Sequence, residues 1–187
     1  KIILLKQEIE RLNINFLKPD INFSDPLFSI EINDNLKSIR FGLAAIKGVG
    51  LKSISSMVDE RNKNGKFKSI IDFMNRVSKE VINKRQLEKL IQAGAFDSIE
   101  ANRSKLFNNV PKFVELFGGE KNINQDMLFE ENEISFEDKN LFNQNYEKWK
   151  NPEILSNELE VIGFYFSDHP LNHYPKKFFE LENIMSF

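Results

Sequence analysis

One short stretch, Lys47-Gly48-Val49-Gly50, constrains this chain most, because two glycines flank a single small apolar residue. The residues before it, 39–46, are mostly apolar, and those after it place Leu51, Ile54 and Val58 at the spacing of one helical face. We therefore expect two short helices that meet at a tight hairpin within residues 39–61. Glycine tolerates positive φ and lets another backbone come close, so such a hairpin leaves unpaired amide groups at the start of the second helix.

Unpaired amide groups and the positive end of a helix dipole together favour a bound anion. Lys47 and Lys52 flank the expected turn, and Ser53 lies in the first turn of the second helix. The anion that suits this arrangement best is a nucleic-acid phosphate. The pattern resembles the helix-hairpin-helix motif, a DNA-binding element without sequence specificity. The alternative is a Gly-x-Gly turn that only joins two core helices.

Composition restricts the class of protein. The 187 residues are 41% hydrophobic and 29% charged, which predicts a globular chain with one ordinary domain or two small ones. The absence of cysteine excludes disulfides, thiolate metal sites and thiol nucleophiles, and it fits a reducing cytoplasm. No apolar run reaches the length of a membrane span. The chain begins with Lys1 instead of Met, which suggests a piece of a longer protein.

Charge is distributed unevenly, although the net charge is only -2. Residues 36–105 hold 15 Lys and Arg against 7 Asp and Glu, a net charge of +8. Residues 106–187 hold 7 against 15, a net charge of -8. A basic block around the glycine turn is typical of a surface that binds a polyanion, although a solvated basic face would look the same.

The remaining patterns predict a mainly α-helical fold with a small N-terminal β-hairpin. Apolar spacing indicates a helix over residues 1–12, and alternating residues from Phe28 to Phe41 indicate a hairpin that turns at 33–35. Ser69 and Asn83 have the features of N-caps for two further helices, with the second ending at Gly94. A polar loop is expected at residues 62–68, and another helix through Leu106, Val110, Phe113 and Phe117.

The turn at 93–98 predicts a second, degenerate helix-hairpin-helix. Two hairpins held rigidly could grip both strands of a duplex through backbone contacts alone. Each cation at these helix ends could equally be an ordinary surface charge. The candidate DNA contacts are Lys47, Gly48, Val49, Gly50, Lys52, Ser53, Lys84, Arg85, Ala93, Gly94, Ala95, Asn102 and Arg103.

An apolar triplet, Met127-Leu128-Phe129, interrupts the acidic stretch 120–137. It is a candidate peptide ligand, with Leu128 and Phe129 as anchors and Gln125 at the rim of a partner's pocket. The alternative is a strand or helical turn packed on this chain. The two histidines, His169 and His173, are separated by Pro170, so no metal site is predicted.

The C-terminal part predicts more helix and an aromatic tail. Phe142, Tyr146 and Trp149 share one helical face, and a further helix starts at Asn151-Pro152 and ends near Gly163. Many aromatic residues follow, which suggests that their packing partner lies outside the chain. They are Phe164, Tyr165, Phe166, Phe178, Phe179 and Phe187.

Together these segments resemble the alpha subunit of bacterial DNA polymerase III, the replicative DNA-directed DNA polymerase. The resemblance rests on residues 17–22, 39–50, 83–103 and 163–171, in the family's order. Within the last segment, Asp168 departs from the small residue usual in the family. The resemblance implies four parts: residues 1–35 as the end of the fingers region, 36–117 as a tandem helix-hairpin-helix domain, 118–150 as an acidic linker, and 151–187 as a helical segment leading to a further domain.

The same resemblance implies partners. The linker would carry a motif for the sliding clamp, the beta subunit, at Gln125, Met127, Leu128 and Phe129, with Asp126 departing from a frequent Leu. Double-stranded DNA and other subunits of the holoenzyme would be further partners, in the cytoplasm. Nucleotidyl transfer needs paired aspartates that hold Mg²⁺, and no such constellation occurs here, so Mg²⁺ belongs to the parent polymerase and no cofactor to this piece.

Two other interpretations remain open at the level of sequence. The chain could be a stand-alone helix-hairpin-helix protein of DNA repair, or an accessory protein. It could also be a structural module whose hairpins pack against neighbouring domains without autonomous DNA binding.

Overall fold

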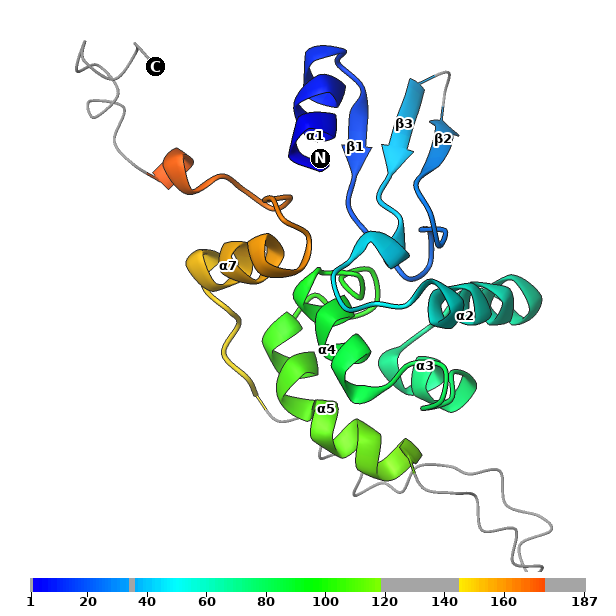
Figure 1. Cartoon of the computed structure of the whole chain (residues 1–187). Coiled ribbons are helices and arrows are strands. Elements are labelled where there is room, and N and C mark those ends of the chain that lie inside the picture. Colours follow the sequence, from blue (N-terminus) through cyan, green and yellow to red (C-terminus); the bar gives the residue numbers. More distant parts are fainter. Residues whose placement is uncertain (1, 34–35, 119–144, 174–187) are drawn as a thin grey trace, which may run out of the picture.

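The computed structural model describes residues 2–33, 36–118 and 145–173. The fold is mainly α-helical with a small sheet near the N-terminus, as the sequence predicts. Figure 1 shows α1 and the sheet at one end of the molecule and helices α2 to α5 at the other, with α7 beside α4. The elements are α1 (Ile2–Arg11), β1 (Asn15–Leu17), β2 (Ser29–Asn33), β3 (Leu36–Arg40), η1 (Leu43–Ala45), α2 (Leu51–Asn64), α3 (Ile70–Arg76), α4 (Lys84–Gln92), α5 (Arg103–Gly118), α7 (Asn151–Val161) and η2 (Pro170–His173).

The predicted hairpin is present, and a third strand joins it. Strands β2 and β3 pair antiparallel, with Ile30 opposite Ile39, whereas β1 pairs parallel to β3, with Phe16 opposite Ile39. The strand order is therefore β1-β3-β2. Because β1 has only three residues, its sequence carries too short an alternation to be recognised. The sheet joins residues on both sides of position 35, where the expected fingers region ends.

The prediction of an α-helix before the glycine turn is wrong. Only one turn of 3-10 helix, η1, forms between the sheet and the glycines. Phe41 instead continues the sheet by donating its backbone N–H to the Leu17 carbonyl oxygen at 3.0 Å, and Gly42 and Ile46 are both extended. Three residues remain between those extended positions, too few for an α-helix.

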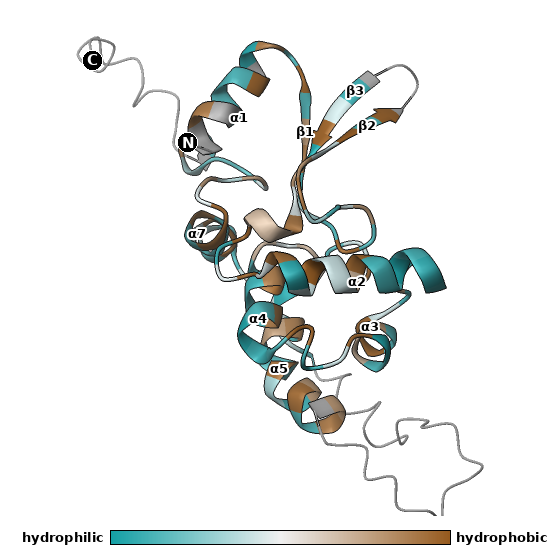
Figure 2. Ribbon diagram, turned by 45° about the vertical axis from the view of Figure 1, so that its right-hand side comes forward, coloured by the Kyte–Doolittle hydropathy of each residue, from teal (hydrophilic) through white to brown (hydrophobic). Residues whose placement is uncertain are grey.

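Helix α2 buries Ile54, Met57 and Val58, but Leu51 is 52% exposed and does not belong to the buried face. Its last turn also extends to Asn64, into the region expected to be a loop. Figure 2 shows hydrophilic residues along the C-terminal half of this helix, which projects away from the other elements. The helix therefore packs on the core through its apolar residues and exposes a hydrophilic surface along its C-terminal half.

The predicted caps of the next helices are confirmed. The Ser69 hydroxyl accepts the Asp72 N–H at 3.1 Å, and Asn83 Oδ1 accepts the Gln86 N–H at 3.0 Å. Gly94 ends the α4 turn with φ +77°, and α5 runs from Arg103 through Pro111 to Gly118. Leu87, Leu90 and Ile91 of α4 and Leu106, Val110 and Phe113 of α5 are buried in one core.

The segment before α7 is not helical, contrary to the prediction from Tyr146 and Trp149; Phe142 lies outside the described residues. Residues 145–150 follow an irregular path along which Trp149 contacts Phe107, with ring centroids 5.5 Å apart. Without the turns of a helix, the aromatic spacing has no common face. Helix α7 then begins at Asn151, as predicted, and Gly163 with φ +97° follows its end.

Part of the aromatic tail packs inside this chain, which corrects the expectation of an outside partner. The Phe164 ring lies 5.8 Å from Phe16 and 6.1 Å from Phe41, and Phe166 lies 5.1 Å and 5.6 Å from the same rings. The chain after α7 is therefore anchored to the sheet. Phe178, Phe179 and Phe187 lie outside the described residues.

Candidate nucleic-acid interface

The first glycine turn is exposed and built as predicted around positive φ. Gly48 has φ +80° and is exposed, whereas Val49 is buried and its N–H donates to the Ile46 carbonyl oxygen at 3.1 Å. The buried valine holds the turn to the core while the glycine faces solvent. A larger residue at position 48 would fit the available space, since a Cβ there would approach only Lys89 Cγ, at 3.8 Å. The positive φ, and not a steric clash with neighbours, therefore disfavours other residues at this position.

Helix α2 starts at this turn without a side-chain cap. Gly50 is the N-cap residue and has no side chain to accept a hydrogen bond, and the first turn contains no acidic residue. The leading amide groups of α2 therefore remain available to an external acceptor at the positive end of the helix dipole. Lys47 and Lys52 are exposed on either side of this terminus, and Ser53 is half-buried beside it.

Helix α4 supplies further cations next to the same turn. A Cβ on Gly50 would lie 3.4 Å from Gln86 Nε2, so the glycine turn abuts the α4 face that contains Gln86 and Lys89. Lys84 and Arg85, at the start of α4, are exposed. Lys89 pairs with Glu160 of α7 at 2.6 Å, and Lys84 approaches Glu88 only at 4.0 Å. No ion pair with a described residue engages Lys47, Lys52 or Arg85.

Helix α7 also holds the turn in place. The Lys47 N–H donates to the carbonyl oxygen of Val161 at 2.8 Å, across more than a hundred residues of sequence. Gln92 of α4 also donates to Asn157 of α7 at 2.9 Å. The backbone of the exposed turn is therefore fixed, whereas the Lys47 side chain remains in solvent. Such a preorganised turn binds an anion without first having to be ordered.

The second glycine turn lies inside the protein. Ala93, Gly94 and Ala95 are all buried, and the Ala95 carbonyl oxygen accepts the Ile21 N–H at 2.8 Å. Asn102 Oδ1 caps α5 by accepting the Lys105 N–H at 3.1 Å, and its Nδ2 donates to the Tyr146 carbonyl oxygen at 2.9 Å. The expected phosphate contacts at this turn are instead packing and capping contacts.

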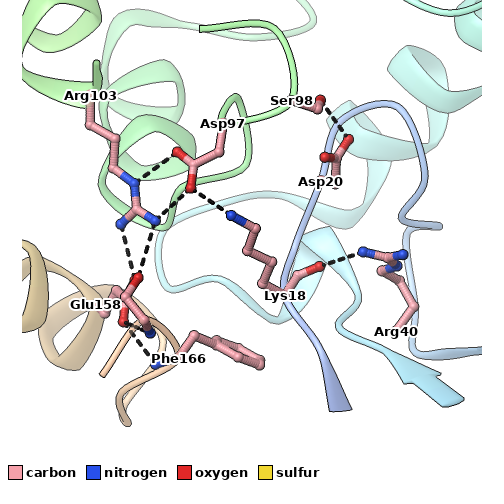
Figure 3. Close-up of polar contacts among 9 residues, drawn as sticks. Lys18, Asp20, Arg40, Asp97, Ser98, Arg103, Glu158 and Phe166 are labelled. Carbon is pink, nitrogen blue, oxygen red and sulfur yellow. Dashed lines mark hydrogen bonds and ion pairs between the residues drawn. The ribbon is translucent and has the colours of Figure 1, made fainter. Parts of the chain in front are cut away.

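Arg103 needs the clearest correction, because its side chain is only 7% exposed and is fully engaged (Figure 3). Its Nε donates to Asp97 Oδ1 at 2.9 Å and its Nη2 to Asp97 Oδ2 at 2.7 Å. Its Nη1 donates to Glu158 Oε1 at 3.0 Å. Two carboxylates thus occupy the guanidinium that was expected to contact DNA, and a phosphate has no free edge of it to bind.

Glu158 is the centre of this network and is fully buried. Its Oε2 accepts the backbone N–H groups of Phe166 at 2.7 Å and Ser167 at 2.9 Å, and its Oε1 accepts the Ser167 hydroxyl. Burial tends to lower the pKa of Arg103, but its hydrogen bonds with Asp97 and Glu158 outweigh that effect, and the pKa is raised. The network keeps Arg103 charged and ties α5 to α7.

Asp97 extends the network to the N-terminal segment. It accepts Lys18 Nζ at 2.9 Å, and the Lys18 carbonyl oxygen in turn accepts Arg40 Nη1 at 3.0 Å (Figure 3). Sequence reasoning missed both carboxylates. One signal was present: Glu158 lies three residues after Leu155 and four before Ile162, on the apolar face of its helix.

The candidate clamp motif, with Gln125, Met127, Leu128 and Phe129, lies outside the described residues. In the described part of the chain, none of the helices has both the length and the apolar character needed to span a membrane. Across the same residues, no three His, Cys, Asp or Glu side chains are grouped so that they could hold a metal ion.

Comparison with known proteins identifies the class. Residues 13–106, about half of the chain, match the family model described as "Helix-hairpin-helix motif". This match includes both glycine turns and the sheet that supports the first one. The chain therefore belongs to the helix-hairpin-helix family.

Individual relatives match nearly the whole chain. The DNA polymerase III subunit alpha of Borreliella burgdorferi is 40% identical over 174 residues, which cover 91% of this chain and 15% of that protein. The subunit of Neisseria meningitidis serogroup A is 41% identical over 165 residues, 88% of this chain and 14% of that protein. The subunit of Escherichia coli strain K12 is 33% identical over 183 residues, 95% of this chain and 15% of that protein. The chain thus matches one region of DNA polymerase III subunit alpha and spans about one seventh of the length of these curated relatives.

Proposed function

We propose that this chain binds duplex DNA without sequence specificity, through phosphate contacts at the turn of Lys47 to Gly50 and the uncapped start of α2. The observation that carries this proposal is an exposed, fixed glycine turn beside Lys47 and Lys52, which form no ion pair with a described residue, in a chain of the helix-hairpin-helix family. Amide donors and flexible ammonium groups suit phosphate oxygens and read no base sequence.

The second turn has a different role in this proposal. With Ala93 to Ala95 buried and Arg103 paired, the α4–α5 turn supports the interface and does not contact DNA. The start of α4 still contributes Lys84 and Arg85, which lie on the helix that abuts the first turn. The sequence predicted two equivalent DNA-binding hairpins, whereas this proposal has one DNA-binding turn, with its free amide groups and the neighbouring cations.

The names of the relatives set the context. We propose that the chain acts within a bacterial replicative DNA polymerase, in which it holds the duplex while other parts of the polypeptide and their Mg²⁺ ions carry out nucleotidyl transfer. Similarity that extends beyond residue 106 to α7 favours a region of such a polymerase over a stand-alone repair protein. A purely structural module of the polymerase would be equally similar, and it is distinguished by the salt series below.

Salt dependence tests the duplex contact. The binding of a mixed-sequence duplex of about two helical turns would be followed by fluorescence anisotropy across a salt series. Each phosphate neutralised contributes about -0.9 to the slope of log K against log salt concentration. Lys47→Gln, which removes one phosphate contact, should therefore make the slope less steep by about 0.9. Lys37→Gln, an exposed lysine on β3, is the matched control. Equal affinity and equal slope for Lys47→Gln and the unmodified chain would remove this turn from the site.

A second pair of variants separates charge from backbone strain. Asn and Asp tolerate positive φ better than other side chains, so Gly48→Asn and Gly48→Asp carry similar strain and differ in charge. We expect Gly48→Asp to bind DNA much more weakly than Gly48→Asn, with both chains folded. Equal binding by the two would show that no phosphate approaches Gly48.

We further propose that Gln125, Leu128 and Phe129 bind the sliding clamp. What supports this is the Gln-x-x-Leu-Phe pattern of these residues, which matches the clamp motif that the resemblance to the polymerase alpha subunit implies. A contact with the clamp would make rebinding to DNA intramolecular. Loss of clamp binding in Leu128→Ala with Phe129→Ala, with duplex affinity unchanged, is the expected result; unchanged clamp affinity would exclude the motif.

A further inference from the structure

A second surface, at the opposite end of α2 from the glycine turn, presents an aromatic ring to solvent. Phe23 is 47% exposed, although the residues on either side of it in the chain, Asn22 and Ser24, are buried. A phenylalanine that served only the core would have the reverse pattern. The exposed ring therefore needs an explanation other than packing.

The backbone around Phe23 is held in one conformation. Asn22 exchanges hydrogen bonds with the backbone of Phe67, donating from Nδ2 at 2.9 Å and accepting at Oδ1 at 2.8 Å. Arg61 Nη1 donates to the carbonyl oxygens of Ile21 at 2.9 Å and Ser24 at 2.7 Å. A ring on so firmly held a turn loses little entropy when it binds a ligand.

Cations surround this ring. Lys66 Nζ lies 3.6 Å from the ring centroid and Arg40 Cζ lies 5.6 Å from it. The pairing of Asn22 with Phe67 brings Lys66 and Lys68, the two neighbours of Phe67 in sequence, to the same loop. Both lysines are exposed.

The nearby carboxylates pair with arginines. Glu31 pairs with Arg40 at 2.6 Å, and Arg76 pairs with both Glu60 at 3.0 Å and Asp72 at 3.2 Å, while Asp25 lies 3.5 Å from Arg61. Within the described part of the chain, Lys66 and Lys68 form no ion pair, although the Lys68 backbone N–H donates to Asp72 at 2.8 Å. Four carboxylates against three arginines and two lysines leave these residues with a net charge of +1.

We propose that Phe23, with Lys66 and Lys68, is a binding site for single-stranded nucleic acid, in which an unpaired base stacks on the Phe23 ring. Every base has a π-face, so stacking on an aromatic side chain tolerates any sequence, and lysines beside the ring neutralise the adjoining phosphates. The base takes the place of the Lys66 ammonium over the ring, and the displaced ammonium is then close to the backbone of the bound strand.

This site extends the duplex contact and does not depend on it. The 14 residues of α2 span about 20 Å at about 1.5 Å each; the glycine turn precedes the helix, and Phe23 lies near its other end, beside Lys66 and the backbone that Arg61 holds. An unpaired strand of several nucleotides spans a helix of this length, since the rise of one strand is about 3.4 Å per nucleotide. The arrangement fits a junction between double-stranded and single-stranded DNA.

The test measures binding of the full chain to four fluorescent DNAs: a blunt duplex, the same duplex with an overhang of about two nucleotides, the same duplex with an overhang of about ten, and a single strand of about ten nucleotides. Phe23→Leu removes the ring and keeps an apolar side chain, whereas Phe23→Tyr keeps a ring and is the matched control. Because Phe23 is exposed, neither should change the urea midpoint.

We expect Phe23→Leu to weaken binding of the single strand and of the long-overhang duplex about tenfold, with blunt and short-overhang duplexes unchanged and Phe23→Tyr near the unmodified chain. Gly48→Asp should weaken blunt-duplex binding and leave single-strand binding intact, so the two sites fail separately. Failure of the unmodified chain to bind the single strand, or equal single-strand binding by Phe23→Leu and the unmodified chain, would overturn the proposal.

Discussion

Gly48 and Gly94 have nearly the same backbone conformation in opposite surroundings, and this difference predicts very different costs of a methyl group. Gly48, with φ +80°, is open to solvent, and Gly94, with φ +77°, faces the Arg103 guanidinium. Alanine at either position incurs a strain of about 1–2 kcal/mol, because its Cβ crowds the following carbonyl group in the left-handed region. At Gly48 the cost should end there.

At Gly94 the Cβ would overlap the Arg103 guanidinium. An exposed arginine would turn aside at little cost, but Arg103 is buried and paired with both Asp97 and Glu158. Displacing it leaves Asp97 with Lys18 alone and takes the guanidinium away from the buried Glu158, and breaking a buried ion pair costs about 3–5 kcal/mol. Gly94→Ala should therefore cost about 4–7 kcal/mol in all, comparable with the whole stability of many domains.

Urea unfolding followed by circular dichroism measures both variants. With a slope of about 2 kcal/mol per molar urea, Gly48→Ala should lower the midpoint by about 0.5–1 M and Gly94→Ala by about 2 M or more. A double-mutant cycle identifies the cause: in an Arg103→Ala chain, the added cost of Gly94→Ala should fall to that of Gly48→Ala. Equal midpoints for the two single variants, or additive costs in the cycle, would refute the reasoning.

Two further changes test the packing and the caps. Phe164→Ala removes a buried ring from the cluster with Phe16 and Phe41 and should cost about 3–5 kcal/mol, measured as a fall in Tm of about 10 °C or more by calorimetry; an unchanged Tm would mean that the segment after α7 is not anchored there. Ser69→Ala removes the α3 cap and should cost about 1 kcal/mol in urea, with duplex affinity unchanged because the proposed DNA contacts lie on α2 and α4; weaker duplex binding would mean that α3 also supports the interface.

Local signals predicted the elements whose stabilising contacts are close in sequence. Ser69 and Asn83 cap their helices three residues on, and Gly94 ends α4 with positive φ, so each signal and its structural cause lie within one turn. The β2–β3 hairpin is equally local. The conformation of the first glycine turn belongs to this group, because its positive φ follows from Gly48 itself; its exposure does not, since Gly94 has nearly the same φ inside the protein.

Contacts between distant residues account for what the sequence did not predict. Strand β1 is defined by its pairing with β3, and Arg103 by Glu158, which is 55 residues away. From sequence alone, an arginine at a helix start is a reasonable phosphate contact, and only the fold shows that a buried carboxylate binds it. The irregular path of residues 145–150 likewise follows from contacts such as that of Trp149 with Phe107.

The most direct test of the central claim is a titration of the ¹⁵N-labelled chain with duplex DNA, followed through its backbone amide resonances. If the first glycine turn binds phosphate, the amides of Gly48, Gly50, Leu51 and Lys52 should shift strongly at low salt and return as salt is raised. The amides of Gly94 and Ala95, inside the protein, should remain unchanged. Shifts at Gly94 and Ala95 without shifts at Gly48 and Gly50 would contradict the assignment of the interface.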